Sequence, residues 1–236
     1  YNFLEEYFQD NLKLYRINGT FQGDPRYNDS LPNFLSSEFE KKEMKFLKYY
    51  KNKLNEFSDN DLDSDQQLSK KILKRELDLE IESKSFNKDL MPIDQMWTFQ
   101  LTFGQLASGK SAQPFNTTAD YQNWLIRLEG YLNFLESAEH KMKEGIKKGY
   151  VLPKSLILKV LPQLKAMTEK DLDKHLFYNP IKNMPASFSN KEKNQLEKDF
   201  IDIIQNKIIP AYQKLHDFMA NEYLDNGRKS SGFSTF

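Results

Sequence analysis

Cysteine is absent from the 236-residue chain. Its absence excludes disulfide bonds, cysteine zinc sites and thiol nucleophiles. A basic excess is also missing, because lysine plus arginine and aspartate plus glutamate each number 34 and the formal net charge is zero. Proteins that bind nucleic acids usually carry a basic excess that displaces counterions. We therefore expect no nucleic-acid partner.

Long apolar runs are missing as well. No stretch approaches the roughly 20 apolar residues that cross a membrane as a helix, so the sequence predicts no transmembrane segment. Large apolar side chains are nevertheless frequent, since aromatic residues make up 14% of the chain beside 29% charged residues. This aromatic content is too high for a disordered chain. The composition predicts a folded protein with a sizeable core.

Apolar residues recur three or four positions apart along most of the chain, and no segment shows the alternation of a half-buried strand. The pattern predicts helices over 1–15, 36–57, 66–86, 95–106, 116–149, 153–167 and 189–227. The expected N-caps are Ser36 or Ser37, Thr117 or Thr118, and Ser189. No clean linker separates the segments. We predict an all-α fold, an irregular antiparallel helical bundle of about seven or eight helices in a single domain, 1–236.

Two glycines stand four residues apart in MKEGIKKGYVLPKSLILKVLPQL, residues 142–164. Gly149 ends a lysine-rich helix before a new helix begins at Pro153. Gly145 lies inside the helix, where glycine costs about 1 kcal/mol relative to alanine. Some other part of the protein must therefore approach the backbone closely at Gly145. It is either another helix, which is the simpler explanation, or part of a binding cleft.

Few residues carry obvious chemistry. The motifs H-E-x-x-H and G-x-S-x-G are absent, and the chain has three histidines. The best local set is Glu136, His140 and Glu144, which stand at i, i+4 and i+8 and share one face of a predicted helix. We treat this set as a weak alternative for a metal site, because metal sites usually recruit ligands from several segments. A solvated polar face explains the same spacing.

Arg127 lies among apolar neighbours in NWLIRLEGYL. An arginine on a mostly buried helix face needs a partner, either an internal carboxylate or a bound anion. Internal pairing is the commoner outcome, so we expect a carboxylate from within the fold.

Several blocks of the sequence resemble, in the same order, those of a large bacterial family of unknown function, the domain-of-unknown-function 885 type. The family's R-E-G-x-x-x-G-x-x-x-P block is similar to KEGIKKGYVLP at 143–153. Its other blocks resemble INGTFQGDPRYNDSLPNF, LMPIDQMWTFQLTFGQLASGKSAQPFNTTADYQNWLIRL, NPIKNMPASFSNKEKNQL and IIPAYQKLHDFMANEYLDNGRKSSGF. Arg16 departs from the pattern, because the family often has proline there.

The resemblance implies that this chain is the N-terminal helical region of a longer protein. Members of the family are usually more than twice this length, and their second half carries an H-E-x-x-P-G-H-H motif typical of gluzincin-like zinc hydrolases. That motif is not in this sequence. The expected cofactor of the intact protein is zinc, with none held by this chain, and the expected partner is the C-terminal catalytic half.

In this interpretation the helical region forms a wall or lid of the cleft that selects a peptide-like substrate. Its substrate-facing residues are expected to be Asp94, Gln95, Arg127, Glu144 and Arg228, which are polar residues inside or beside the matched blocks. We expect no catalytic residue in this chain. An arginine among them would hold a substrate carboxylate bidentately.

An alternative interpretation is a self-contained, non-enzymatic helical interaction module of the bacterial cell envelope. The neutral charge and the lack of active-site motifs suit it equally well. Because members of the resembled family are often exported, some as lipoproteins, we expect a periplasmic or cell-envelope location in either case. The chain begins at Tyr1, which is compatible with a lipid anchor attached through a removed N-terminal signal.

Overall fold

The computed structural model describes residues 2–96 and 98–232. Within them the regular secondary structure is helical, with one isolated β-bridge between Pro153 and Arg228 and no β-strand. The helices are α1 (Asn2–Leu14), α2 (Arg16–Phe21), α3 (Ser37–Asn55), α4 (Ser64–Ser83), α5 (Phe99–Ala107), α6 (Thr118–Lys148), α7 (Lys154–Ala166), α8 (Asn179–Lys182), α9 (Asn190–Ile203), α10 (Ile209–Phe218) and α11 (Leu224–Asn226). The predicted all-α bundle is confirmed.

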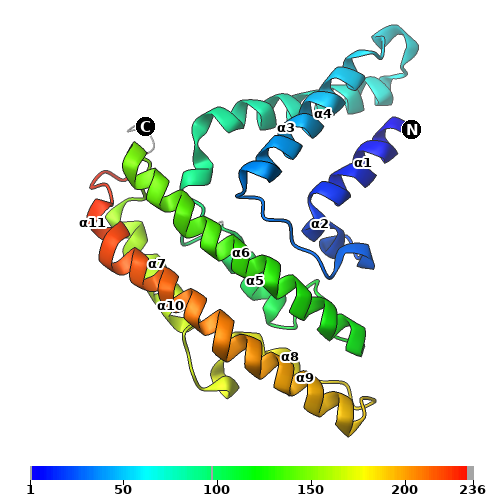
Figure 1. The fold of residues 1–236 in the computed structure, drawn as a ribbon. Helices are drawn as coiled ribbons and strands as arrows, with labels where there is room; N and C mark the ends of the chain where they lie inside the picture. Colours follow the sequence, from blue (N-terminus) through cyan, green and yellow to red (C-terminus); the bar gives the residue numbers. More distant parts are fainter. Residues whose placement is uncertain (1, 97, 233–236) are drawn as a thin grey trace.

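The apolar side chains gather in two clusters. In Figure 1, α1, α3 and α4 lie on one side of α6, and α7, α9 and α10 lie on the other. The small cluster joins α1, α3 and α4 through buried residues of α3 and α4: Leu47, Tyr50, Leu54, Leu73 and Leu77. The large cluster joins α6 to α5, α7, α9 and α10, and its most buried side chains include Trp124, Tyr131, Phe200 and Tyr212. Helix α6 is the longest helix and lies in the middle of the fold (Figure 1). Two clusters do not by themselves divide a chain into domains, and the single domain stays a prediction.

Local sequence patterns set where the main helices begin. The Thr117 hydroxyl accepts from the backbone N–H of Asp120, while the Asp120 carboxylate accepts from the backbone N–H of Thr117 at 2.8 Å. Ser189 and Glu192 form the same reciprocal capping box at the start of α9. Each box pairs two backbone donors that the first helical turn leaves without intrahelical partners. The predicted caps are confirmed, with Thr117 and Ser36 as the residues used.

Pro210 lies inside the segment that the sequence predicts as one long helix. The structure keeps the segment helical by placing a π-helical turn, η7 (Ile204–Ile208), immediately before α10, where Pro210 stands in the first turn. Proline has no backbone N–H and crowds the carbonyl four residues earlier. A π turn changes the hydrogen-bond register from i→i−4 to i→i−5, which is one way in which a helix accommodates such a disturbance without ending.

No helix within residues 2–96 and 98–232 combines the length and the apolar character that crossing a membrane requires.

Candidate functional site: a groove over helix α6

Two connecting segments cross α6 at glycines. A Cβ placed on Gly130 would lie 2.6 Å from the carbonyl oxygen of Leu31, in the loop that leads into α3. A Cβ on Gly145 would lie 2.8 Å from the carbonyl oxygen of Leu90, in the 3-10 turn η4 (Lys88–Leu90). At both points glycine allows one backbone to rest directly on another. The close packing of η4 on α6 therefore explains why residue 145 is a glycine. The same segment lines a groove.

The groove lies over α6 between these two crossings and has a volume of about 610 Å³. Its walls come from α3, from the segment between α4 and α5, and from α6. Three aromatic rings form an apolar group in it: Phe34 is 4.8 Å from Phe99 and 4.9 Å from Phe134 between ring centroids, and Phe99 and Phe134 are 5.1 Å apart. Such a group supplies an apolar surface of fixed shape.

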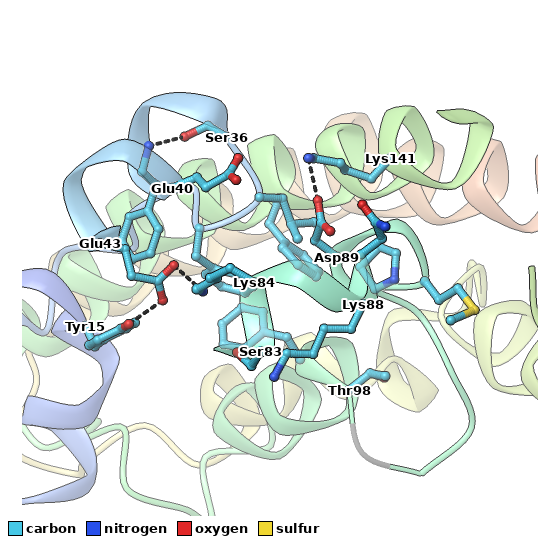
Figure 2. A pocket seen from close by; sticks show the side chains of 18 of the residues that line it. Tyr15, Ser36, Glu40, Glu43, Ser83, Lys84, Lys88, Asp89, Thr98 and Lys141 are labelled. Atoms are coloured by element: carbon cyan, nitrogen blue, oxygen red, sulfur yellow. Dashed lines mark hydrogen bonds and ion pairs between the residues drawn. The ribbon is translucent and has the colours of Figure 1, made fainter. Parts of the chain in front are cut away.

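An ion pair buried at one end of the groove joins α3 to the end of α4. Glu43 is 7% exposed, and its carboxylate accepts hydrogen bonds from the Tyr15 hydroxyl and the Lys84 ammonium group (Figure 2). Burial, followed by the hydrogen bond to Glu43, raises the pKa of Tyr15 well above its ordinary value of 10. The tyrosine therefore stays a donor at any physiological pH. This cluster fixes α1, α3 and α4 relative to one another.

A second ion pair holds η4 against α6. The Lys141 ammonium group lies 2.6 Å from a carboxylate oxygen of Asp89 (Figure 2). Next to Asp89, the exposed Lys88 has no hydrogen-bond or ion-pair partner for its ammonium group among the described residues, and the same is true of the carboxylate of Glu40 on α3. The groove thus combines an aromatic group with one available cation and one available anion on different walls.

Of the five residues predicted to face a substrate, Asp94 lines the groove. Its carboxylate accepts from the backbone N–H of Met96 at 2.7 Å, and its carbonyl accepts from the Gln100 side chain at 2.7 Å. The neighbouring Gln95 is half-buried, and its carbonyl accepts from the Gln163 side chain of α7 at 3.1 Å. These contacts shape the turn that enters α5.

The other three lie elsewhere. Arg127 is fully buried on α6 and donates to Gln113. Glu144 pairs with Lys148 at 2.6 Å along the surface of α6. Arg228 donates to the carbonyl of Val151 at 3.1 Å and so ties the chain after α11 to the start of α7. The structure therefore does not bring the five together, and their role in binding stays a prediction.

The set Glu136, His140 and Glu144, the weak alternative for a metal site, likewise has no support beyond its spacing in the sequence. Glu136 and His140 are exposed on α6, and Glu144 is engaged by Lys148. In the described ranges no group of three or more histidine, aspartate or glutamate side chains is arranged to hold a metal ion.

The groove residues that sequence reasoning missed are joined across long stretches of chain. Lys84 and Glu43 are 41 positions apart, and Lys141 and Asp89 are 52 positions apart. Charged residues at such separations show no periodicity that marks them as partners. The available signal was Gly145, which indicated that some segment lies against α6 at that point.

Comparison with known proteins identifies the fold family. The family model described as "Bacterial protein of unknown function (DUF885)" matches residues 17–235. The chain belongs to this family. Among solved structures it is similar to "the putative lipoprotein from Colwellia psychrerythraea", with a TM-score of 0.83 and 17% sequence identity. That likeness covers 98% of this chain and shows a shared fold.

The chain spans 42% of the length of the Colwellia psychrerythraea protein. No curated protein sequence matches it.

Proposed function

We propose that this chain is the N-terminal helical region of a longer zinc-dependent peptidase or other hydrolase, and that the groove over α6 forms part of the wall of its substrate cleft. The observation that supports this most is the groove, which has the size and mixed lining of a ligand site, while the described residues contain no group arranged to hold a metal ion. A region of this kind binds and selects, while the chemistry belongs to residues beyond it. The shared fold in a protein more than twice as long is consistent with such a division.

The described residues of this chain do not fit a zinc ion, since they offer no set of metal ligands. We therefore assign them no chemical step. If the intact protein holds zinc, its ligands come from the C-terminal half that the resemblance implies, and the metal activates a water molecule there.

A peptide-like substrate suits the lining of the groove. Phe34, Phe99 and Phe134 offer an apolar surface for a side chain. Lys88 offers a cation to a carboxylate, and Glu40 offers an anion to an amine. Because Lys84 and Lys141 are already paired, Lys88 is the lysine of the lining that a negatively charged group would meet first.

The test uses the protein produced from its complete reading frame. We expect about one zinc per chain by elemental mass spectrometry and cleavage of a mixed peptide library followed by mass spectrometry. In the variant Lys88→Glu, KM for the best cleaved peptide that has a carboxylate near the scissile bond should rise about tenfold, because a like charge replaces an opposite one. The matched control is Lys147→Glu, since Lys147 is exposed on α6 outside the groove lining.

A protein without bound metal and without peptide cleavage would contradict the hydrolase. Equal KM values in the two lysine variants would contradict the role of the groove, even in an active enzyme.

We also propose that the protein resides in the cell envelope. The support is the description of the structurally similar protein as a lipoprotein and the export common among members of the resembled family. Fractionation of cells expressing the complete reading frame tests this, and recovery of the protein with the cytoplasmic fraction alone would contradict it.

A further inference from the structure

Arg127 is a buried cation that lacks an acidic partner. It stands in the N-terminal half of α6 with 0% of its surface exposed. One guanidinium nitrogen, Nη1, donates to Oε1 of Gln113 at 2.5 Å, and Nη2 donates to the carbonyl oxygen of Tyr27. Both acceptors are neutral. Among the residues that the structure describes, no carboxylate forms an ion pair with Arg127, so the expected internal carboxylate is not the partner.

The guanidinium nevertheless keeps its charge. Burial lowers the pKa of Arg127 to about 10, and the more distant Asp29 works in the opposite direction. The group is therefore protonated at neutral pH. Asp29 itself is exposed to solvent, where its field is strongly screened. Most of the positive charge of Arg127 is left without compensation inside the protein, which is an unfavourable arrangement.

Three buried N–H donors around this charge have no acceptor: Nε of Arg127, Nε2 of Gln113 and Nε1 of Trp124. Their side chains are neighbours. Gln113 is bonded directly to Arg127, and Trp124 precedes Arg127 by one turn of α6. Phe115, two residues after Gln113, packs edge-on against Trp124 at 5.8 Å. Buried donors are almost always paired in folded proteins, so three unpaired donors in one cluster indicate an acceptor that the chain itself does not supply.

We propose that Arg127, Gln113 and Trp124 form a buried site for a small monovalent anion such as chloride. Every group in the cluster that lacks a partner is a donor, and the cluster carries a net positive charge. A water molecule would accept from these donors but would leave the charge uncompensated, whereas an anion satisfies both requirements. The carboxylate of a peptide substrate is excluded, because all three side chains are at most 2% exposed. This site is independent of the groove and of the proposed hydrolase function.

The direct test is a crystal of the intact protein grown in sodium gluconate and soaked in sodium bromide. The proposal expects an anomalous bromide peak within hydrogen-bond distance of Nε of Arg127. It also expects a higher melting temperature in sodium chloride than in sodium gluconate at equal ionic strength. For a domain of this size the difference is about 3–6 °C when the anion exceeds its Kd tenfold.

A single isosteric substitution separates the anion from a purely structural role. Gln113→Glu places a carboxylate where Oε1 already meets Arg127, so it supplies the missing charge from within. We expect this variant to fold, to lose the bromide peak and to lose the difference between chloride and gluconate. The control Gln122→Glu adds the same charge on the exposed face of α6 and should keep both. Equal melting temperatures of the unmodified protein in the two salts, or a bromide peak unchanged in Gln113→Glu, would overturn the proposal.

Discussion

Replacing Gly145 by alanine should destabilise the fold, against the usual trend for helices. In an exposed helix interior, alanine is favoured over glycine by about 1 kcal/mol. Here the added Cβ would lie 2.5 Å from the carbonyl oxygen of Tyr150 and 2.8 Å from that of Leu90. Both are backbone atoms, so no change of rotamer relieves the contact. Overpacking of this kind costs about 1–3 kcal/mol and occasionally more.

Because a backbone segment has to move, we place the cost at the upper end of that range. Subtracting the gain in helix propensity leaves a net loss of about 2 kcal/mol in the free energy of unfolding. Relief of the contact with Leu90 displaces η4, so the ion pair between Asp89 and Lys141 should weaken at the same time. The assay is urea unfolding at 25 °C followed by circular dichroism, with the midpoint and the slope fitted separately.

Two other glycines provide matched controls. A Cβ on Gly104, inside α5, meets only Leu176 at 3.5 Å within 4 Å, which is an ordinary contact, so Gly104→Ala should be neutral or stabilising by up to about 1 kcal/mol. A Cβ on Gly149 meets nothing within 4 Å, but the residue has a φ of 78°. Gly149→Ala should therefore lose about 1 kcal/mol through backbone strain alone. If Gly145→Ala were as stable as the unmodified protein, the argument from close backbone approach would be refuted.

Two further predictions concern polar contacts between α6 and α10. Burial raises the pKa of Glu139, but hydrogen bonds from Lys143 and Lys214 outweigh burial and bring the pKa below its ordinary 4.5. The ionised Glu139 therefore stabilises the fold fully above pH 4.5, and this stabilisation is lost as the pH falls through the lower pKa of the folded state. By urea unfolding, Glu139→Gln should cost about 1–3 kcal/mol at pH 7, and this cost should shrink as the pH falls below 4.5 and through the lower folded pKa. A cost that stays constant over the whole acid range would contradict the assignment. Tyr131→Phe should cost about 1–2 kcal/mol, because it leaves the buried hydroxyl of Tyr212 without its 2.7 Å partner. The double variant with Tyr212→Phe should recover part of that loss, and a purely additive result would contradict the pairing.

The helices could be predicted because their signals are local. The capping boxes that begin with Thr117 and Ser189 each lie within four consecutive residues, and the structure uses both. The apolar spacing of the long helices needed no knowledge of what they pack against. Pro210 indicated a disturbance of the last long helix, but not the form that the disturbance takes. The π turn before it depends on the packing of Ile204 and Ile208 in the large apolar cluster.

The site could be predicted only in part, because its contacts are not local. Arg127 was correctly expected to be a buried cation in need of a partner, yet the sequence favoured a carboxylate, while the structure provides Gln113 and a backbone carbonyl. The partner comes from a loop with no periodic pattern. Likewise, Lys88 differs from the other lysines of the groove because Lys84 and Lys141 form ion pairs across long stretches of chain, which the sequence does not indicate.

One stripe of α6 explains why the groove lies where it does. Gly130, Phe134, Lys141 and Gly145 follow one another at intervals of four, seven and four residues, which keeps all four near one face of a helix. The two glycines admit the crossing segments at points about 22 Å apart along the axis. Between them, Phe134 and Lys141 line the groove. The residues of α6 therefore determine where the groove lies, but their spacing predicts the groove only when the two segments that cross α6 are known.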